Sequence, residues 1–148
     1  MRLAQVPGIV GIKDATADLG RGSELIRALL AANRRDFAIY SGEDITALPL
    51  LLMGGHGVIS VTANVAPRSM AEMVKAALAG DIATARERND RLLPLHRKLF
   101  VEANPIPVKW AVSQMKLIKP GIRLPLTPLA DNCHERVRTA MREAGIDV

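Results

Sequence analysis

Short aliphatic runs alternate with helix-length segments through the first half of the chain. The runs cover residues 9–13, 37–41 and 57–61, and β-branched residues are frequent in them. A helix-length segment follows each run, over 23–33, 43–53 and 67–80, and apolar residues recur at helical spacing in the first of these. Strands that alternate with helices in this way are typical of a parallel sheet. The pattern therefore predicts an α/β fold with three consecutive βα units.

The strand pattern disappears after residue 80, and only helices are expected beyond it. They cover 81–101, 107–118 and 128–144. Pro94 predicts a bend in the first of these helices, and Thr127 and Gly145 are suited to cap the two ends of the third. Pro49 likewise predicts a kink within 43–53. We therefore expect two regions, βα units over 1–80 and helices over 81–148, without a flexible linker between them.

Composition narrows the class of protein. Of the 148 residues, 49% are hydrophobic and 24% are charged, as in a globular domain. Aromatic residues make up only 3%, so the core must be aliphatic, and an aromatic platform for nucleic-acid bases is not expected. Cys133 is the single cysteine, so an internal disulfide is excluded. This composition fits a reducing compartment, and we expect a cytoplasmic protein.

The net charge of +5 arises in the C-terminal half. Residues 67–148 carry fourteen basic and nine acidic side chains, whereas the charges of residues 1–66 balance. The two signs alternate over 86–91, which is typical of a solvated helix face. The longest apolar run, over 47–53, is far shorter than the roughly 18 residues of a membrane span, and no signal-peptide pattern opens the chain. Neither nucleic acid nor a membrane is an expected partner.

Lys13 is the first candidate for chemistry, because it ends an otherwise apolar strand. Active sites of parallel α/β folds lie at the carboxyl ends of the strands. A lysine held in an apolar barrel loses hydration, so its pKa falls and the free amine can attack a carbonyl carbon to form a Schiff base. A lysine at a strand end is also commonly a surface residue whose ammonium reaches water. The strand pattern alone leaves both interpretations open.

The glycine cluster at 54–57 is the second candidate, because glycine permits close approach of a ligand to the backbone. A helix end followed by a turn explains these glycines equally well, and neither phosphate-loop spacing is present. His56, His96 and His134 lack the spacing of metal ligands, so no metal site is expected.

Three parallel strands do not close a sheet, and an open edge is normally covered or paired. Ile39, Val58 and Ile59 are expected to face the interior of a closed barrel, and so to be exposed in a monomer of this chain. We therefore expect a homo-oligomer.

Six ordered motifs carry a resemblance to a known family. They are GIKDAT around Lys13, SGED at 41–44, GGHGVISVTANVAP at 54–67, PLHRKLF at 94–100, NPIPVKWA at 104–111 and RLPLTPL at 123–129. Together they resemble the dihydrodipicolinate synthase family, within the superfamily of pyruvate-dependent Schiff-base aldolases. The resemblance implies a TIM (β/α)8 barrel followed by a C-terminal helical extension, assembled as a homotetramer.

The resemblance also implies a reaction and its residues. The family lysine that forms the imine with pyruvate falls on Lys13, and Ile59 matches the position whose backbone lies beside the bound pyruvate. Gly42 and Asn104 match positions near the mouth of the site, where L-aspartate 4-semialdehyde approaches. The implied reaction belongs to lysine and diaminopimelate biosynthesis and uses no cofactor besides the covalent imine.

The chain departs from the family in length. A TIM barrel takes about 250 residues, and this chain supplies only what resembles strands 6, 7 and 8, so it is expected to be a C-terminal part. The family's threonine pair and tyrosines, which relay protons, have no counterpart here. We therefore expect the nucleophile to be retained with little or no turnover by the chain alone. Two alternatives stay open: another pyruvate aldolase, similar to N-acetylneuraminate lyase, and a non-catalytic assembly fragment.

Overall fold

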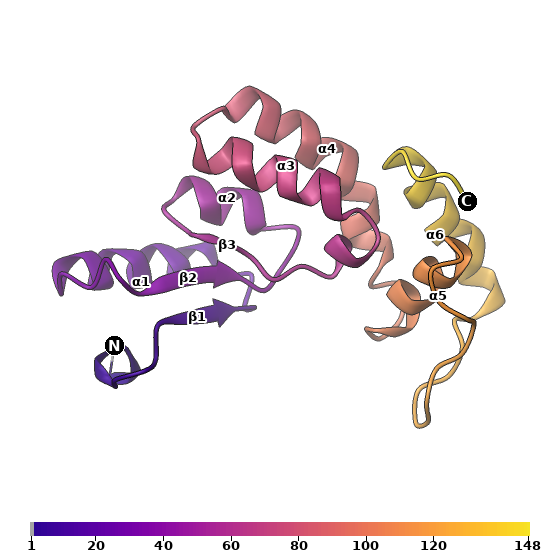
Figure 1. Cartoon of the computed structure of the whole chain (residues 1–148), viewed down its shortest axis with the longest axis horizontal. Helices are drawn as coiled ribbons and strands as arrows, with labels where there is room; N and C mark the ends of the chain where they lie inside the picture. The colour runs from indigo at the N-terminus through magenta and orange to yellow at the C-terminus, as the bar shows by residue number, and fades with distance from the viewer. Residues whose placement is uncertain (1) are drawn as a thin grey trace. The chain divides into compact units, whose positions relative to one another are not determined.

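The computed structural model describes residues 2–148 and is a mixed α/β structure (Figure 1). Its strands are β1 (Gly11–Asp14), β2 (Ala38–Ser41) and β3 (Gly57–Val58). Its α-helices are α1 (Leu19–Ala31), α2 (Ala47–Leu52), α3 (Pro67–Leu78), α4 (Ile82–Lys98), α5 (Ile106–Gln114) and α6 (Asp131–Glu143), and the 3-10 helices are η1 (Arg2–Gln5) and η2 (Thr62–Asn64). The order confirms three βα units followed by helices alone.

The three strands form one parallel sheet in the order β1-β2-β3. Lys13 is in register with Tyr40, and Tyr40 with Gly57, so these residues form one row across the sheet. Among the described residues, β1 and β3 pair on one side only. The sheet is therefore open at both edges, as the sequence predicts.

The chain divides into two compact units. The first contains the residues up to Ser60 together with Met73–Ala85, and the second contains Val61–Glu72 together with Arg86–Val148. Residues of α3 belong to both units. The sheet lies wholly in the first unit.

One face of the sheet is buried under helices. Ile39 of β2 is only 2% exposed and packs in a core with Leu29 of α1, Leu50 of α2 and Phe37. This overturns the expectation that Ile39 faces a barrel interior. Side chains alternate between the faces of a strand, and Tyr40, not Ile39, shares the row of Lys13. The helix-covered face and the face that carries Lys13 are therefore opposite sides of the same sheet.

Helix α1 begins four residues earlier than predicted. Asp18 caps it, because its side chain accepts a hydrogen bond from the backbone N–H of Arg21 at 2.9 Å. The helix ends at Ala31, and Asn33 follows it in the left-handed region with φ of 53°. An aspartate is a favoured N-cap, so this signal was present in the sequence.

Helix α2 is shorter than the segment predicted over 43–53. It begins at Ala47, which places Pro49 in its first turn. A proline there removes no helical hydrogen bond, so the expected kink has no cause. Strand β3 is also shorter than predicted, although Ile59 N–H donates to Ser41 C=O at 2.8 Å and so extends its pairing by one residue.

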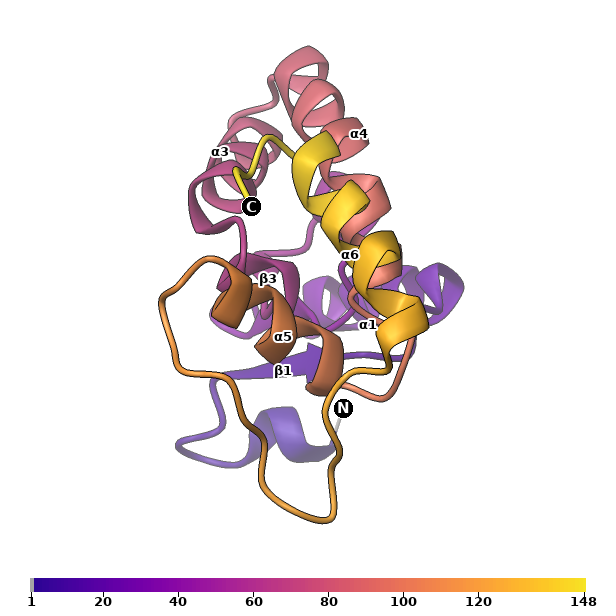
Figure 2. The ribbon, with the colours of Figure 1, turned by 90° about the vertical axis from the view of Figure 1, so that its right-hand side faces the viewer.

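The second unit contains α5, α6 and the long connection between them (Figure 2). Trp110 of α5 stacks on His134 of α6, with ring centroids 4.7 Å apart and planes inclined by 15°, and the Arg138 guanidinium lies 5.4 Å from the Trp110 ring centroid. Helix α6 begins at Asp131, with Ala130 rather than Thr127 at its N-cap. Glu102 accepts a hydrogen bond from Ala130 N–H at 3.1 Å, so the N-cap residue is held by a side chain 28 residues earlier.

The predicted end of the last helix at Gly145 is confirmed, whereas the bend expected at Pro94 stays a prediction. Pro94 lies inside α4, and Gly145 follows α6 with φ of 78°, as expected for a residue that ends a helix. Across residues 2–148, none of the helices is long and apolar enough to cross a membrane.

Candidate active site

Lys13, Gly42 and Ile59 meet at the carboxyl end of the sheet. Lys13 is the next-to-last residue of β1, Gly42 directly follows β2, and Ile59 directly follows β3. Gly42 N–H donates to Asp14 C=O at 2.7 Å, and Ile59 N–H donates to Ser41 C=O at 2.8 Å. The ladder of the sheet thus continues past the strands and fixes the backbones of the three predicted site residues relative to one another.

The three residues also share one face of the sheet. Lys13, Tyr40 and Gly57 form one row across the strands, and Gly42 and Ile59 lie two residues beyond Tyr40 and Gly57. Positions two apart on a strand face the same side. This is the open face, on which Tyr40 is 37% exposed and Ile59 51% exposed. Side chains of Lys13, Tyr40 and Ile59 are therefore accessible together from one side.

Of the two interpretations of Lys13, a buried amine and a surface residue, the structure shows the second. Its side chain is exposed, because the helices cover only the opposite face of the sheet. The desolvation that a closed barrel would impose on the Lys13 amine is therefore absent from these residues alone. The position of Lys13 at the strand end follows from the sequence, whereas the environment of its amine depends on what covers the open face of the sheet.

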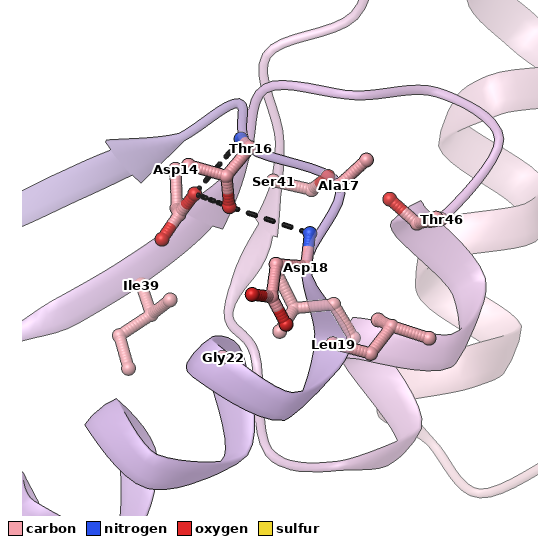
Figure 3. A pocket seen from close by; sticks show the side chains of 10 residues that line it. Asp14, Thr16, Ala17, Asp18, Leu19, Gly22, Ile39, Ser41 and Thr46 are labelled. Atoms are coloured by element: carbon pink, nitrogen blue, oxygen red, sulfur yellow. Dashed lines mark hydrogen bonds between the residues drawn. The ribbon is translucent and has the colours of Figure 1, made fainter.

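A hydrogen-bonded turn directly follows Lys13 (Figure 3). The Asp14 carboxylate accepts from the Thr16 N–H at 3.0 Å, from the Thr16 hydroxyl at 2.6 Å and from Nε of Arg21 at 3.0 Å. Its side chain is only 7% exposed. The hydrogen bond from the Thr16 hydroxyl, reinforced by those from the Thr16 N–H and Arg21, lowers the pKa of Asp14 below its ordinary value, although burial opposes this. A charged Asp14 therefore ties β1 to the start of α1.

Sequence reasoning missed this turn. Its signal was an aspartate two residues before a threonine, a pattern that favours hydrogen bonds between the side chain and the local backbone. Arg21, seven residues beyond Asp14, comes within reach only because α1 begins at Leu19. The turn holds the end of β1 on the side of the sheet opposite the Lys13 side chain.

A small cavity lies beside this turn, on the helix-covered side (Figure 3). Asp14, Thr16 and Asp18 line it together with Ile39 and Ser41. Its space holds little more than one water molecule. It is too small for an organic substrate. The candidate site is the open face around Lys13, because Lys13, Gly42 and Ile59 meet there.

Asn104 belongs to the second compact unit, where it is exposed shortly before α5. The first unit thus unites three of the four predicted site residues. The fourth stays a prediction from the resemblance.

The glycine cluster forms a helix end and a turn. Gly54 has φ of 114°, and a Cβ on Gly55 would lie 2.9 Å from the Leu50 carbonyl oxygen, so both positions require glycine for backbone reasons. His56 then accepts a hydrogen bond from Ile39 N–H at Nδ1, at 3.1 Å. Within the described chain, no three His, Cys, Asp or Glu side chains gather closely enough to hold a metal ion.

The family model described as the dihydrodipicolinate synthetase family matches residues 1–144. Among curated proteins, the 4-hydroxy-tetrahydrodipicolinate synthase of Nitrosospira multiformis is 65% identical over the whole chain, and that of Thiobacillus denitrificans is 63% identical over 97% of it. The chain covers 48% and 47% of these two proteins. It therefore spans about half the length of the curated relatives it matches.

Solved structures agree. A chloride-inhibited dihydrodipicolinate synthase from Acinetobacter baumannii, complexed with pyruvate, matches with a TM-score of 0.92 and 53% identity, over 99% of this chain and 49% of that one. A dihydrodipicolinate synthase from Thermotoga maritima matches with a TM-score of 0.90 and 40% identity, over 97% of this chain and 48% of that one. The three βα units are thus part of a TIM barrel. With its strand-end lysine, its sheet and its matched sequence, this chain belongs to the dihydrodipicolinate synthetase family.

Proposed function

We propose that this chain carries the Schiff-base lysine of an enzyme that condenses pyruvate with L-aspartate 4-semialdehyde, in lysine and diaminopimelate biosynthesis. One observation carries the proposal: Lys13 lies at the carboxyl end of a parallel sheet, on the same face as Gly42 and Ile59. Active sites of TIM barrels lie at this end of the strands. The relatives at 65% and 63% identity bear the name of the corresponding synthase, which favours this reaction over that of the sugar-acid lyases.

The proposed chemistry begins with the neutral amine of Lys13. It attacks the keto carbon of pyruvate, and loss of water leaves an imine between Nζ and that carbon. Loss of a proton from the methyl group gives an enamine, whose carbon attacks the aldehyde of the second substrate. The amine of that substrate then attacks the imine carbon, which closes the ring and releases Lys13 as the free amine.

Each of the four candidate site residues has a proposed part in these steps. Lys13 is the nucleophile, and the backbone at Ile59 lies beside the bound pyruvate. Gly42 and Asn104 border the approach of the aldehyde. Tyr40 is the single tyrosine of the chain, so the tyrosine relay implied by the resemblance is not supplied here. General acid and base groups contribute about 100- to 10,000-fold, so turnover by these residues alone is expected to be slow.

The proposed partners are the two small substrates and further copies of the chain. The open face presents Ile59 and Tyr40, which are 51% and 37% exposed, and apolar surface of this kind favours association. No cofactor takes part in the proposed chemistry besides the covalent imine on Lys13. The proposed compartment is the cytoplasm.

The proposed reaction is tested by asking which aldehyde the chain consumes together with pyruvate. The purified chain is mixed with pyruvate and either aspartate semialdehyde or a sugar aldehyde, and loss of each aldehyde is followed by NMR. We expect slow, Lys13-dependent consumption of aspartate semialdehyde only, with Lys13→Ala as the control. Consumption of the sugar aldehyde alone would indicate a lyase instead of the synthase. Equal rates of aldehyde consumption by the parent chain and by Lys13→Ala would show that Lys13 takes no part in the reaction.

A further inference from the structure

We infer that Gly42 is a positioning residue for Lys13: its missing side chain leaves the space in which the Lys13 methylene stem lies, and so sets where the amine is presented. The consequence for catalysis rests on the proposed function. The contact between the two residues does not, so the two can be tested separately.

A side chain at position 42 would collide with Lys13. A Cβ placed on Gly42 would lie 2.7 Å from Cε and 3.0 Å from Cγ of Lys13. Carbon atoms in favourable contact are ~3.5–4.0 Å apart, so neither distance can persist. The stem of Lys13 therefore occupies the volume that any other residue at position 42 would fill.

The backbone does not require glycine at this position. Positive φ angles occur at Gly54 and Gly80, among others, but not at Gly42. Gly42 N–H continues the ladder to Asp14 C=O at 2.7 Å, in a conformation that other residues can adopt. What glycine provides here is space, and the side chain that uses this space is that of the candidate nucleophile.

An exposed lysine needs such a constraint. Its four-carbon stem has many rotamers, and fixing them in one arrangement costs conformational entropy. The Lys13 side chain is exposed on the open face. With Gly42 beneath it, the stem can lie close to the sheet and direct the amine along the strand ends. A methyl group at position 42 lifts the stem and moves the amine.

Ala15 offers a control within the same site. The Cβ placed on Gly42 would also lie 2.7 Å from the Cβ of Ala15, so Gly42→Ala creates a second collision that does not involve Lys13. Ala15→Gly removes only this second collision. Gly20→Ala is the matched exchange elsewhere, because the nearest atom to a Cβ there is an Asp18 carboxylate oxygen at 3.2 Å.

The experiment compares the parent chain, Ala15→Gly, Gly20→Ala, Gly42→Ala and the double variant Gly42→Ala/Ala15→Gly, with folding checked by circular dichroism. The first readout is the NMR signals of the Lys13 stem in chains labelled with ¹³C-lysine. The second is the rate at which borohydride traps pyruvate on Lys13, measured by peptide mapping. The double variant keeps the test valid if Gly42→Ala alone does not fold.

We expect both Gly42 variants to shift the Cγ and Cε signals of Lys13 and to slow trapping about 10- to 100-fold, since ~1 Å of misplacement costs on the order of 100-fold. Ala15→Gly and Gly20→Ala should behave as the parent does. Unshifted Lys13 signals in the folded double variant would overturn the inference, as would a parental trapping rate in that variant. If the parent traps no pyruvate, the proposed function fails for this chain, and the Lys13 signals alone decide whether the contact holds.

Discussion

The Asp14 carboxylate is held by both polar groups of Thr16, at 3.0 Å from the backbone N–H and 2.6 Å from the hydroxyl. Arg21 adds a third hydrogen bond, so one side chain joins the end of β1 to the first turns of α1. Asp14 directly follows Lys13 in the chain. The geometry of this turn therefore affects the strand end that presents the candidate nucleophile.

Replacing Asp14 should destabilise the first unit. Asp14→Asn keeps the size of the side chain but loses its charge and one acceptor, which leaves a poorly satisfied group at a site that is 7% exposed. Loss of this network should lower the free energy of unfolding by on the order of 1–3 kcal/mol in urea denaturation. Asp36→Asn is the matched control, because Asp36 pairs with Arg34 at the surface and should contribute little. Equal effects of the two substitutions would contradict the importance of the turn.

The Asp14 contribution should depend on pH. The pKa of Asp14 is lowered on folding from an ordinary 3.8. At acid pH the Asp14 carboxyl group is therefore protonated less often in the folded state than in the unfolded state. The stabilisation is therefore fully present above about pH 4 and is lost as the pH falls through the lowered pKa. In urea denaturation between pH 6 and pH 2, the gap in stability between the parent and Asp14→Asn should narrow only in this acid range. A gap that widens on acidification would reverse the assigned sign.

Two isoleucines on neighbouring strands test which face of the sheet is buried. Ile39 is 2% exposed and Ile59 is 51% exposed. Ile39→Ala should cost ~2–5 kcal/mol because it leaves a cavity in the core, whereas Ile59→Ala should change the stability of the monomer little. Denaturation at low protein concentration measures both. A large loss for Ile59→Ala under these conditions would show that the open face is already covered.

The stacked pair Trp110 and His134 should stabilise the second unit. His134→Ala removes a ring 4.7 Å from that of Trp110 and also its hydrogen bond to Leu129 C=O. The expected loss is about 1 kcal/mol, with the midpoint of unfolding followed through fluorescence of Trp110, the single tryptophan. His56→Ala is the control in the first unit, because it removes a hydrogen-bonded histidine but no ring stacked on Trp110, so the Trp110 spectrum should stay that of the parent. An unchanged Trp110 spectrum and midpoint in His134→Ala would contradict the pairing.

The order of elements and the position of Lys13 could be predicted from the sequence because both depend on local pattern. The period of apolar residues gave the βα units, and the strand-end position of Lys13 followed from the first of them. The face of each strand was harder to predict, because the residues of β2, Ala38–Ser41, show no clear alternation of apolar and polar side chains that would orient it. Ile39 was therefore placed on the wrong side, and Tyr40 took the position beside Lys13.

Contacts between residues far apart in the chain could not be predicted from local sequence patterns. Helix α6 was expected to begin after Thr127, but Ala130 is its N-cap, and Glu102, 28 residues earlier, accepts a hydrogen bond from Ala130 N–H. The crossing of the Lys13 stem over Gly42 likewise depends on the register of β1 and β2, which no local motif specifies. The exposure of Lys13 depends on the cover of the open face and could not follow from the strand alone.

Borohydride trapping with pyruvate, followed by intact-mass analysis and peptide mapping, tests most directly whether Lys13 is the nucleophile. We expect one reduced adduct of pyruvate per chain, confined to Lys13 and absent from Lys13→Ala. Adducts spread over several surface lysines in the folded chain, or an adduct that persists in Lys13→Ala, would contradict the assignment of Lys13 as the nucleophile.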